Sequence, residues 1–302
     1  MNIAVVYHQP SDCSDAWSTP LGLATALASE GAHVVFYPFA NPVAVTLPPL
    51  SKLLADQIDV VLIFYAGASA SLDSELIKLR LLIDDQLSAL KIICELGDEP
   101  QTRCHNAVRA QVSDLCLSPD DPSALKWRSL GAPCVWYTHW ADTSIFHESQ
   151  ERPREQLVVT TMGRRRYAKR LRLLLGGRFA NRHCHGLENG RFYSQGQIAF
   201  QYARWNEVTR RVFEAAACGC CVLTNRLPAA TRMEELFPAD VAAVYYDGFV
   251  SLMLALWKLT TRPALRQAIA TEGQRRVLSA HTQSVRAQQL LAYLGSMSER
   301  PG

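Results

Sequence analysis

Apolar runs with strand character alternate with amphipathic stretches of helical spacing along the first half of the chain. The runs are rich in Val, Ile and aromatic residues, a composition typical of strands, and the stretches between them repeat their apolar positions every three to four residues. The predicted strands are 2–8, 33–39, 58–67, 91–98, 114–118 and 133–139, and the predicted helices are 19–31 and 73–90. Strands that alternate with helices predict a parallel sheet covered on both faces.

The alternation restarts in the second half, after a polar stretch at 147–156 that contains Pro153 and has the composition of an interdomain linker. The predicted strands there are 157–163, 178–186, 197–203, 220–225 and 241–247, the predicted helices 167–177 and 209–219, and three further helical segments close the chain at 249–260, 263–280 and 282–295. The sequence therefore predicts two α/β domains in tandem, 1–146 and 156–282, followed by a C-terminal helix and tail, 283–302, that can cross back to the first domain.

Composition narrows the class of protein. The chain is 48% hydrophobic and 20% charged, which is usual for globular proteins, and no apolar run is long enough to span a bilayer. The start of the chain lacks the basic region of a signal peptide, so we expect a cytoplasmic protein without membrane insertion. The nine cysteines lie mostly in apolar segments, which indicates reduced core thiols, and neither CGCC (218–221) nor HCH (183–185) has the spacing of a zinc site.

Positive charge is concentrated in one stretch of the sequence, although the net charge of the whole chain is only +3. Ten basic residues and one acid, Glu155, lie between Arg152 and Arg182. A solvated helix face usually carries both signs, so this block favours an anionic ligand, either phosphates or a nucleic acid. Binding to DNA phosphates would weaken steeply with salt.

The helix predicted at 209–219 combines two features that call for a partner. Arg210 and Arg211 lie in its first turn, where the helix dipole already attracts anions, and a bound phosphate would compensate them. Glu214 follows among small apolar residues, where an unpaired carboxylate would be costly. Two partners are open: an ion pair with Arg210 or Arg211, or the 2′,3′-hydroxyls of a ribose.

Other candidate ligand contacts follow predicted strands, at the edge where open parallel sheets bind their ligands. Gly163 ends one strand and is followed by Arg166, Lys169 and Arg170. The glycine-containing stretch HGLENGRFYSQ is predicted to be a loop whose Tyr193 stacks on a base. The aromatic cluster WYTHW, 136–140, fits a sugar or base platform or a domain interface.

The stretch RRVFEAAACG, the tail HTQSVR and the segment CELGDEPQT resemble the CgeB-type (spore-maturation-protein-like) glycosyltransferases, which are related to family 4. The resemblance covers about 191–291. It implies the GT-B fold: two Rossmann-like doubly wound parallel-sheet domains facing a central cleft, with a C-terminal helical tail. It also implies a nucleotide-diphosphate sugar as co-substrate, an acceptor bound to the N-terminal domain, and no cofactor or obligatory metal. Asp-x-Asp, G-x-G-x-x-G and P-loop motifs are absent from the sequence, in agreement.

Under this resemblance the residues take roles in glycosyl transfer. The donor phosphates are assigned to Gly163, Arg166, Lys169, Arg170, Arg210 and Arg211, and the donor ribose and base to Glu214, Tyr193 and Thr209. Candidates for a catalytic base are Asp98, Glu99 and His139, near predicted strand ends. Six residues separate Glu207 from Glu214, whereas family 4 has seven between its two glutamates, so the stereochemistry stays open.

The predicted activity is hexosyl or related glycosyl transfer to a hydroxyl of a protein, a glycan or a hydroxylated DNA base. The alternative is a nucleotide- or sugar-binding protein without transferase activity.

Overall fold

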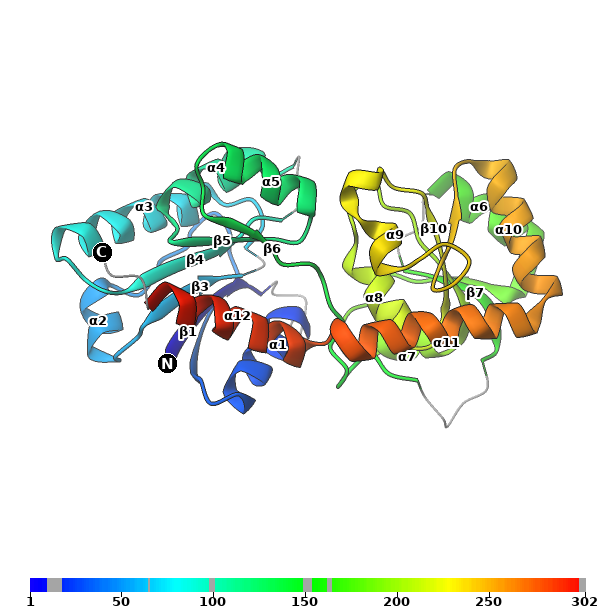
Figure 1. Cartoon of the computed structure of the whole chain (residues 1–302), viewed down its shortest axis with the longest axis horizontal. Coiled ribbons are helices and arrows are strands. Elements are labelled where there is room, and N and C mark those ends of the chain that lie inside the picture. The colour runs from blue at the N-terminus through cyan, green and yellow to red at the C-terminus, as the bar shows by residue number, and fades with distance from the viewer. Residues whose placement is uncertain (10–17, 65, 98–100, 149–153, 162–164, 299–302) are drawn as a thin grey trace. The chain divides into compact units, whose positions relative to one another are not determined.

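The computed structural model describes residues 1–302 except 10–17, 65, 98–100, 149–153, 162–164 and 299–302. The chain forms two compact units (Figure 1): one contains 1–138 together with 286–302, and the other contains 139–285. The predicted linker at 147–156 lies partly outside the described residues. No helix in the described part of the chain is both long and apolar enough to cross a membrane.

The first unit contains a parallel six-stranded sheet of order β2-β1-β3-β4-β5-β6. Its strands are β1 (Asn2–His8), β2 (His33–Phe39), β3 (Val60–Ile63), β4 (Lys91–Glu95), β5 (Leu115–Ser118) and β6 (Cys134–Trp136). Its helices are α1 (Ser18–Ser29), α2 (Leu50–Ala55), α3 (Ala70–Asp85), α4 (Arg103–Val112), α5 (Asp121–Ser129) and α12 (Gln283–Ser298), of which α12 begins in the second unit. The middle strands are buried on both faces, which explains their continuous apolar sequences.

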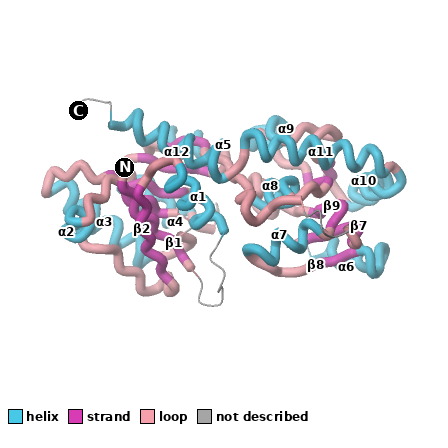
Figure 2. Tube along the Cα trace, turned by 90° about the horizontal axis from the view of Figure 1, so that it is seen from below, coloured by secondary structure: helices cyan, strands magenta, loops and turns pink. Residues whose placement is uncertain are grey.

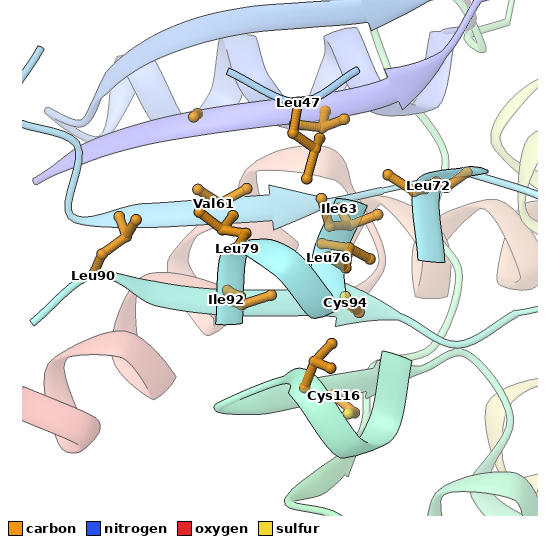
Figure 3. Packing of buried hydrophobic residues seen from close by; sticks show 14 of the residues in the cluster. Leu47, Val61, Ile63, Leu72, Leu76, Leu79, Leu90, Ile92, Cys94 and Cys116 are labelled. Carbon is orange, nitrogen blue, oxygen red and sulfur yellow. The ribbon is translucent and has the colours of Figure 1, made fainter. Parts of the chain in front are cut away.

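Helix α3 packs its apolar side on this sheet (Figure 3). Leu72, Leu76 and Leu79 come from α3 and meet the side chains of β3 and β4. Ser69 caps the helix by accepting a hydrogen bond from the backbone N–H of Leu72, 3.1 Å away. This cap explains why α3 begins before the predicted helix at 73–90.

The second unit contains a parallel five-stranded sheet of order β11-β10-β9-β7-β8. Its strands are β7 (Gln156–Thr160), β8 (Phe179–Asn181), β9 (Gly196–Phe200), β10 (Cys221–Asn225) and β11 (Val244–Tyr246). Its helices are α6 (Arg165–Leu175), α7 (Gly186–Ser194), α8 (Arg210–Ala217), α9 (Met233–Leu236), α10 (Phe249–Thr261) and α11 (Pro263–Ala280), with 3-10 turns at Gly176–Arg178 and Ala229–Thr231. Figure 2 separates these strands from their helices by colour.

The chain enters the second unit well before β7. The backbone N–H of Ala141 donates to the carbonyl of His281 at 3.0 Å, and that of Thr143 donates to Gln283 Oε1 at 3.0 Å. These bonds hold residues that follow β6 against the end of α11 and the start of α12. The eight described cysteines are free, and all of them except Cys104 are buried, as the sequence predicts.

Candidate functional site

The strand order locates the point at which the second sheet can bind a ligand. Strands β7 and β9 are neighbours, and the chain leaves them in opposite directions, from β7 to β8 and from β9 to β10. In open α/β sheets of this order, ligands bind at the carboxyl ends of such a strand pair. Thr161 follows β7 there and Gln201 follows β9. We call the region of Thr161, Gln201 and the first turn of α8 the switch-point edge.

Tyr193 joins the two strands beneath this edge. Its hydroxyl lies 2.9 Å from Thr161 Oγ1 and 2.9 Å from Gln201 Nε2, which donates to it. Tyr193 has no exposed surface, and burial raises the pKa of its hydroxyl far above the usual value, with the Glu214 charge adding to the effect. The prediction that this ring stacks on a base from a loop is therefore wrong, because Tyr193 is a core residue that fixes β7 against β9.

The sequence predicts a loop over 185–195 because of its glycines, but Gly186–Ser194 form helix α7. Gly190 lies so close to the backbone carbonyl of Ile145 that a Cβ atom would clash with it. The glycine thus allows close packing of a helix and does not mark a turn. Sequence reasoning missed Asn189 for the same reason.

Two side chains of the described residues contact the Glu214 carboxylate. The residue is 1% exposed; Arg210 Nε lies 2.8 Å from its Oε1, and Asn189 Nδ2 donates to its Oε2 at 3.1 Å. The sequence predicts either an ion pair with Arg210 or Arg211 or a contact with a ribose, and in the structure Glu214 forms the ion pair with Arg210. Each carboxylate oxygen accepts more than one hydrogen bond, so these contacts orient Glu214 and leave acceptor capacity on both oxygens.

Arg211 behaves differently from its neighbour. Its Nη1 is buried and has no hydrogen-bond partner among the described residues, and its charge opposes the rise in the pKa of Tyr193. The hydroxyl of Thr160, the last residue of β7, is also buried and unpartnered within the described part of the chain. An unsatisfied buried polar atom is costly, and a polar ligand that reached Thr160 and Arg211 would offset this cost.

The remaining phosphate candidates are spread over α6 and its approach. Gly163 lies outside the described residues. Arg166 and Lys169 are exposed, and the Arg170 guanidinium lies 4.5 Å from the centre of the Phe249 ring. Thr209 precedes α8 and makes no side-chain cap. The structure thus brings Thr209, Arg210, Arg211 and Glu214 together in α8 and its N-cap, and it holds Arg170 against α10.

One member of the basic block is structural. Arg154 is half-buried, donates to the carbonyls of Gly196 and Cys218 at 2.5 and 2.8 Å, and pairs with Glu148 at 2.9 Å. These bonds fasten the start of β7 to β9 and to the end of α8. Arg154 is therefore not available to an anionic ligand.

The proposed catalytic bases are distributed over both units. Asp98 and Glu99 lie outside the described residues, and His139 is a half-buried residue at the start of the second unit.

The first unit holds a pair that sequence reasoning missed. His105 Nδ1, at the start of α4, lies 2.5 Å from Asp73 Oδ2, and Arg109 Nε bonds the other oxygen of Asp73 at 3.1 Å. Asp73 is 6% exposed and His105 is half-buried. No other partner of His105 occurs among the described residues. The partners are 32 positions apart in the sequence and belong to no motif, so only the fold reveals them.

Metal ligands do not gather in the described part of the chain: no group of three or more His, Cys, Asp or Glu residues is placed to hold an ion. His183 and His185 pack edge to face, with ring centres 4.7 Å apart.

Comparison with known proteins agrees with this fold. Residues 145–292 match the family model described as glycosyl transferase-like. No protein with a curated function matches the sequence.

Solved structures match over nearly the whole chain. Sucrose-phosphate synthase from Thermosynechococcus elongatus is 12% identical with a TM-score of 0.66, over 97% of this chain and 98% of its own. Anabaena HepE in complex with UDP is 14% identical with a TM-score of 0.66, over 98% and 100%. An alpha-glucosyltransferase in complex with UDP-glucose and DNA containing an abasic site is 11% identical with a TM-score of 0.62, over 98% and 99%.

These matches define the class of protein. The chain has the GT-B fold, with two parallel-sheet α/β units, and its residues 145–292 are similar to glycosyl transferase-like proteins. The predicted fold class and the predicted enzyme class, a glycosyltransferase, are confirmed.

Proposed function

We propose that the protein is a CgeB-type glycosyltransferase that binds a nucleotide-diphosphate sugar at the switch-point edge and transfers the sugar to an acceptor hydroxyl. The observation that carries the proposal is the pair formed by Arg211 and Glu214. One has a buried guanidinium nitrogen without a partner among the described residues, and the other is a buried, oriented carboxylate one turn away. A bound diphosphate would give the Arg211 guanidinium a hydrogen-bond partner, and a bound ribose would use the remaining acceptor capacity of the Glu214 carboxylate.

The leaving diphosphate needs positive charge as the glycosidic bond breaks. Arg211 supplies a guanidinium at the switch-point edge, and the free N–H groups at the start of α8 add the field of the helix dipole. Arg210 screens Glu214 from the same phosphates through its 2.8 Å contact with the carboxylate. The proposed transfer thus uses protein cations to stabilise the leaving group. Gly163, Arg166 and Lys169 remain proposed contacts of the donor phosphates.

UDP is the first nucleotide to test, because HepE and the alpha-glucosyltransferase were crystallised with UDP or UDP-glucose. Guanosine and thymidine diphosphates are the next candidates.

On the acceptor side, an inverting transfer needs a base to remove the hydroxyl proton. Asp98, Glu99 and His139 stay as proposals from the sequence. His105 is the candidate that the structure adds: Asp73 fixes its Nδ1, and Arg109 and its bond to the Gly67 carbonyl fix Asp73 in turn. A histidine held in this way presents Nε2 as the proton acceptor, and the carboxylate stabilises the imidazolium that forms.

The acceptor is a hydroxyl of a protein, a glycan or a hydroxylated DNA base. An alpha-glucosyltransferase with this fold has been solved with DNA, which supports a hydroxylated DNA base as a candidate acceptor. Binding of duplex DNA that falls by orders of magnitude between low and physiological salt would support it.

A thermal-shift screen with nucleoside diphosphates tests donor binding. A ligand present at 100 times its Kd stabilises the native state by about 2.7 kcal/mol, which is readily measured. Slow hydrolysis of the matching nucleotide sugar then separates an enzyme from the alternative, a nucleotide-binding protein without transferase activity. Binding with no hydrolysis and no transfer to any acceptor favours the alternative, and no shift with any nucleotide refutes both.

A further inference from the structure

Helices α6 and α10 cover the same face of the second sheet. Ala168 and Leu171 of α6 share one buried core with Leu252 and Leu256 of α10. The helices also meet near their N-terminal ends, where Tyr167 and Arg170 of α6 contact Phe249 of α10, with the two aromatic ring centres 6.0 Å apart. We call the exposed outer sides of these two neighbouring helices the α6–α10 face.

The outer side of α10 is apolar. Val250, Leu254 and Trp257 are 73%, 62% and 61% exposed and follow one another at i, i+4 and i+7, so they line one side of the helix. The opposite side is apolar as well and supplies the core through Leu252, Ala255, Leu256 and Leu259. A surface helix of a globular protein normally exposes polar residues on this side, and a continuous apolar patch marks an interaction site.

Helix α6 adds two further exposed apolar side chains and positive charge to this face. Leu173 and Leu174 are 86% and 61% exposed, and Arg166, Lys169 and Arg172 are exposed on the same helix. Neither α6 nor α10 contains an acidic residue. The two acids that flank α10 are paired: Asp240 lies 2.9 Å from Lys258, and Asp247 lies 3.4 Å from Arg226. The α6–α10 face therefore combines exposed leucine, valine and tryptophan with uncompensated positive charge.

We propose that the α6–α10 face docks the protein on an anionic membrane surface. Leucine and valine enter the acyl boundary of a bilayer, tryptophan prefers the headgroup region, and arginine and lysine bind anionic headgroups. This is peripheral docking by helices that lie on the bilayer, in keeping with the lack of a spanning helix in the described residues.

Two other occupants fit the face less well. Duplex DNA would satisfy the arginines and leave the apolar stripe of α10 against a charged backbone. A second copy of this chain docked face to face would bury the apolar stripe and bring two sets of α6 cations together. An anionic bilayer is the partner that matches both properties of the face at once.

Vesicle co-sedimentation of the full-length protein tests the proposal without donor or acceptor, so its outcome does not depend on the proposed activity. We expect binding to vesicles of phosphatidylcholine mixed with phosphatidylglycerol and little binding to phosphatidylcholine alone, with a loss at high salt. The double variant Leu254→Gln/Trp257→Gln should bind the mixed vesicles about tenfold or more weakly, because it removes two apolar side chains from the stripe. Arg172→Gln should weaken binding about fivefold.

The matched control is Leu125→Gln/Leu130→Gln in the first unit, which replaces two leucines that are 53% and 67% exposed. It should bind as the wild type does. Equal loss in the control, equal binding to neutral vesicles, or no binding to either vesicle overturns the proposal. So does salt-sensitive binding to duplex DNA without vesicle binding, or a dimer in light scattering that Leu254→Gln/Trp257→Gln dissociates. Circular dichroism of each variant confirms folding.

Discussion

Replacing Arg211 by methionine separates a ligand-binding arginine from a structural one. The buried Nη1 has no partner among the described residues, and an unsatisfied buried polar group costs about 1–3 kcal/mol. Methionine keeps the aliphatic stem and removes that group. The free energy of unfolding of the ligand-free variant should therefore be unchanged or higher, by up to about that amount.

The same substitution should weaken nucleotide binding. A hydrogen bond to a charged group contributes about 1.5–3 kcal/mol, which corresponds to a rise in the Kd for UDP of about 10- to 150-fold. Urea unfolding followed by circular dichroism gives the first quantity, and isothermal titration with UDP gives the second.

The neighbouring arginine provides the control. Arg210 pairs with Glu214, so Arg210→Met leaves a buried carboxylate without its cation. Breaking a fully buried pair costs about 3–5 kcal/mol, and the loss here should fall at or below the lower end because the Arg210 side chain is 21% exposed. The two arginine variants should thus differ in the sign of their effect on stability. If Arg211→Met lowers the free energy of unfolding by more than about 1 kcal/mol and leaves the Kd for UDP unchanged, Arg211 is structural and the reasoning is refuted.

Three further predictions address the other residues. Glu214→Gln should weaken UDP binding about tenfold or more and leave pyrophosphate binding nearly unchanged, because pyrophosphate has no ribose; an equal loss for both in titration calorimetry would argue against a ribose contact. His105→Gln should lower the turnover of glycosyl transfer by about 10²- to 10⁴-fold without changing the Kd for UDP. Asp73→Asn should lower the turnover by a smaller factor. Full turnover in His105→Gln would exclude His105 as the base. Iodoacetamide at pH 8 should label the exposed Cys104 and spare Cys220, since burial raises the pKa of the Cys220 thiol to about 11 and keeps it protonated; mass spectrometry that finds both labelled at one rate would contradict this burial.

Local patterns were sufficient to predict most of the fold. The apolar runs at 2–8, 91–98 and 220–225 became β1, β4 and β10, because buried parallel strands need continuous apolar sequence. The three last helices were predicted within a few residues, because their apolar spacing is long and regular. The helix with Arg210 and Glu214 was also predicted from its own sequence, as was the need of that carboxylate for a partner.

Features that depend on contacts between distant positions could not be predicted. The sequence predicts Gly190 in a loop, and only the carbonyl of Ile145 beside it shows why a helix there needs glycine. The sequence predicts a ligand contact for Tyr193, but its hydroxyl connects residues that follow β7 and β9. The choice between Arg210 and Arg211 as the partner of Glu214 likewise depends on side-chain direction, which periodicity does not fix.

Hydrogen–deuterium exchange with and without UDP tests the central claim most directly, because it reports both binding and its place in the chain. Peptides that contain Thr161, Asn189 and the first turn of α8 should exchange more slowly with UDP present, and the protection should disappear in Arg211→Met at the same UDP concentration. Protection confined to the first unit, or no change in exchange at saturating concentrations of UDP or of guanosine or thymidine diphosphate, would contradict a nucleotide-sugar site at the switch-point edge.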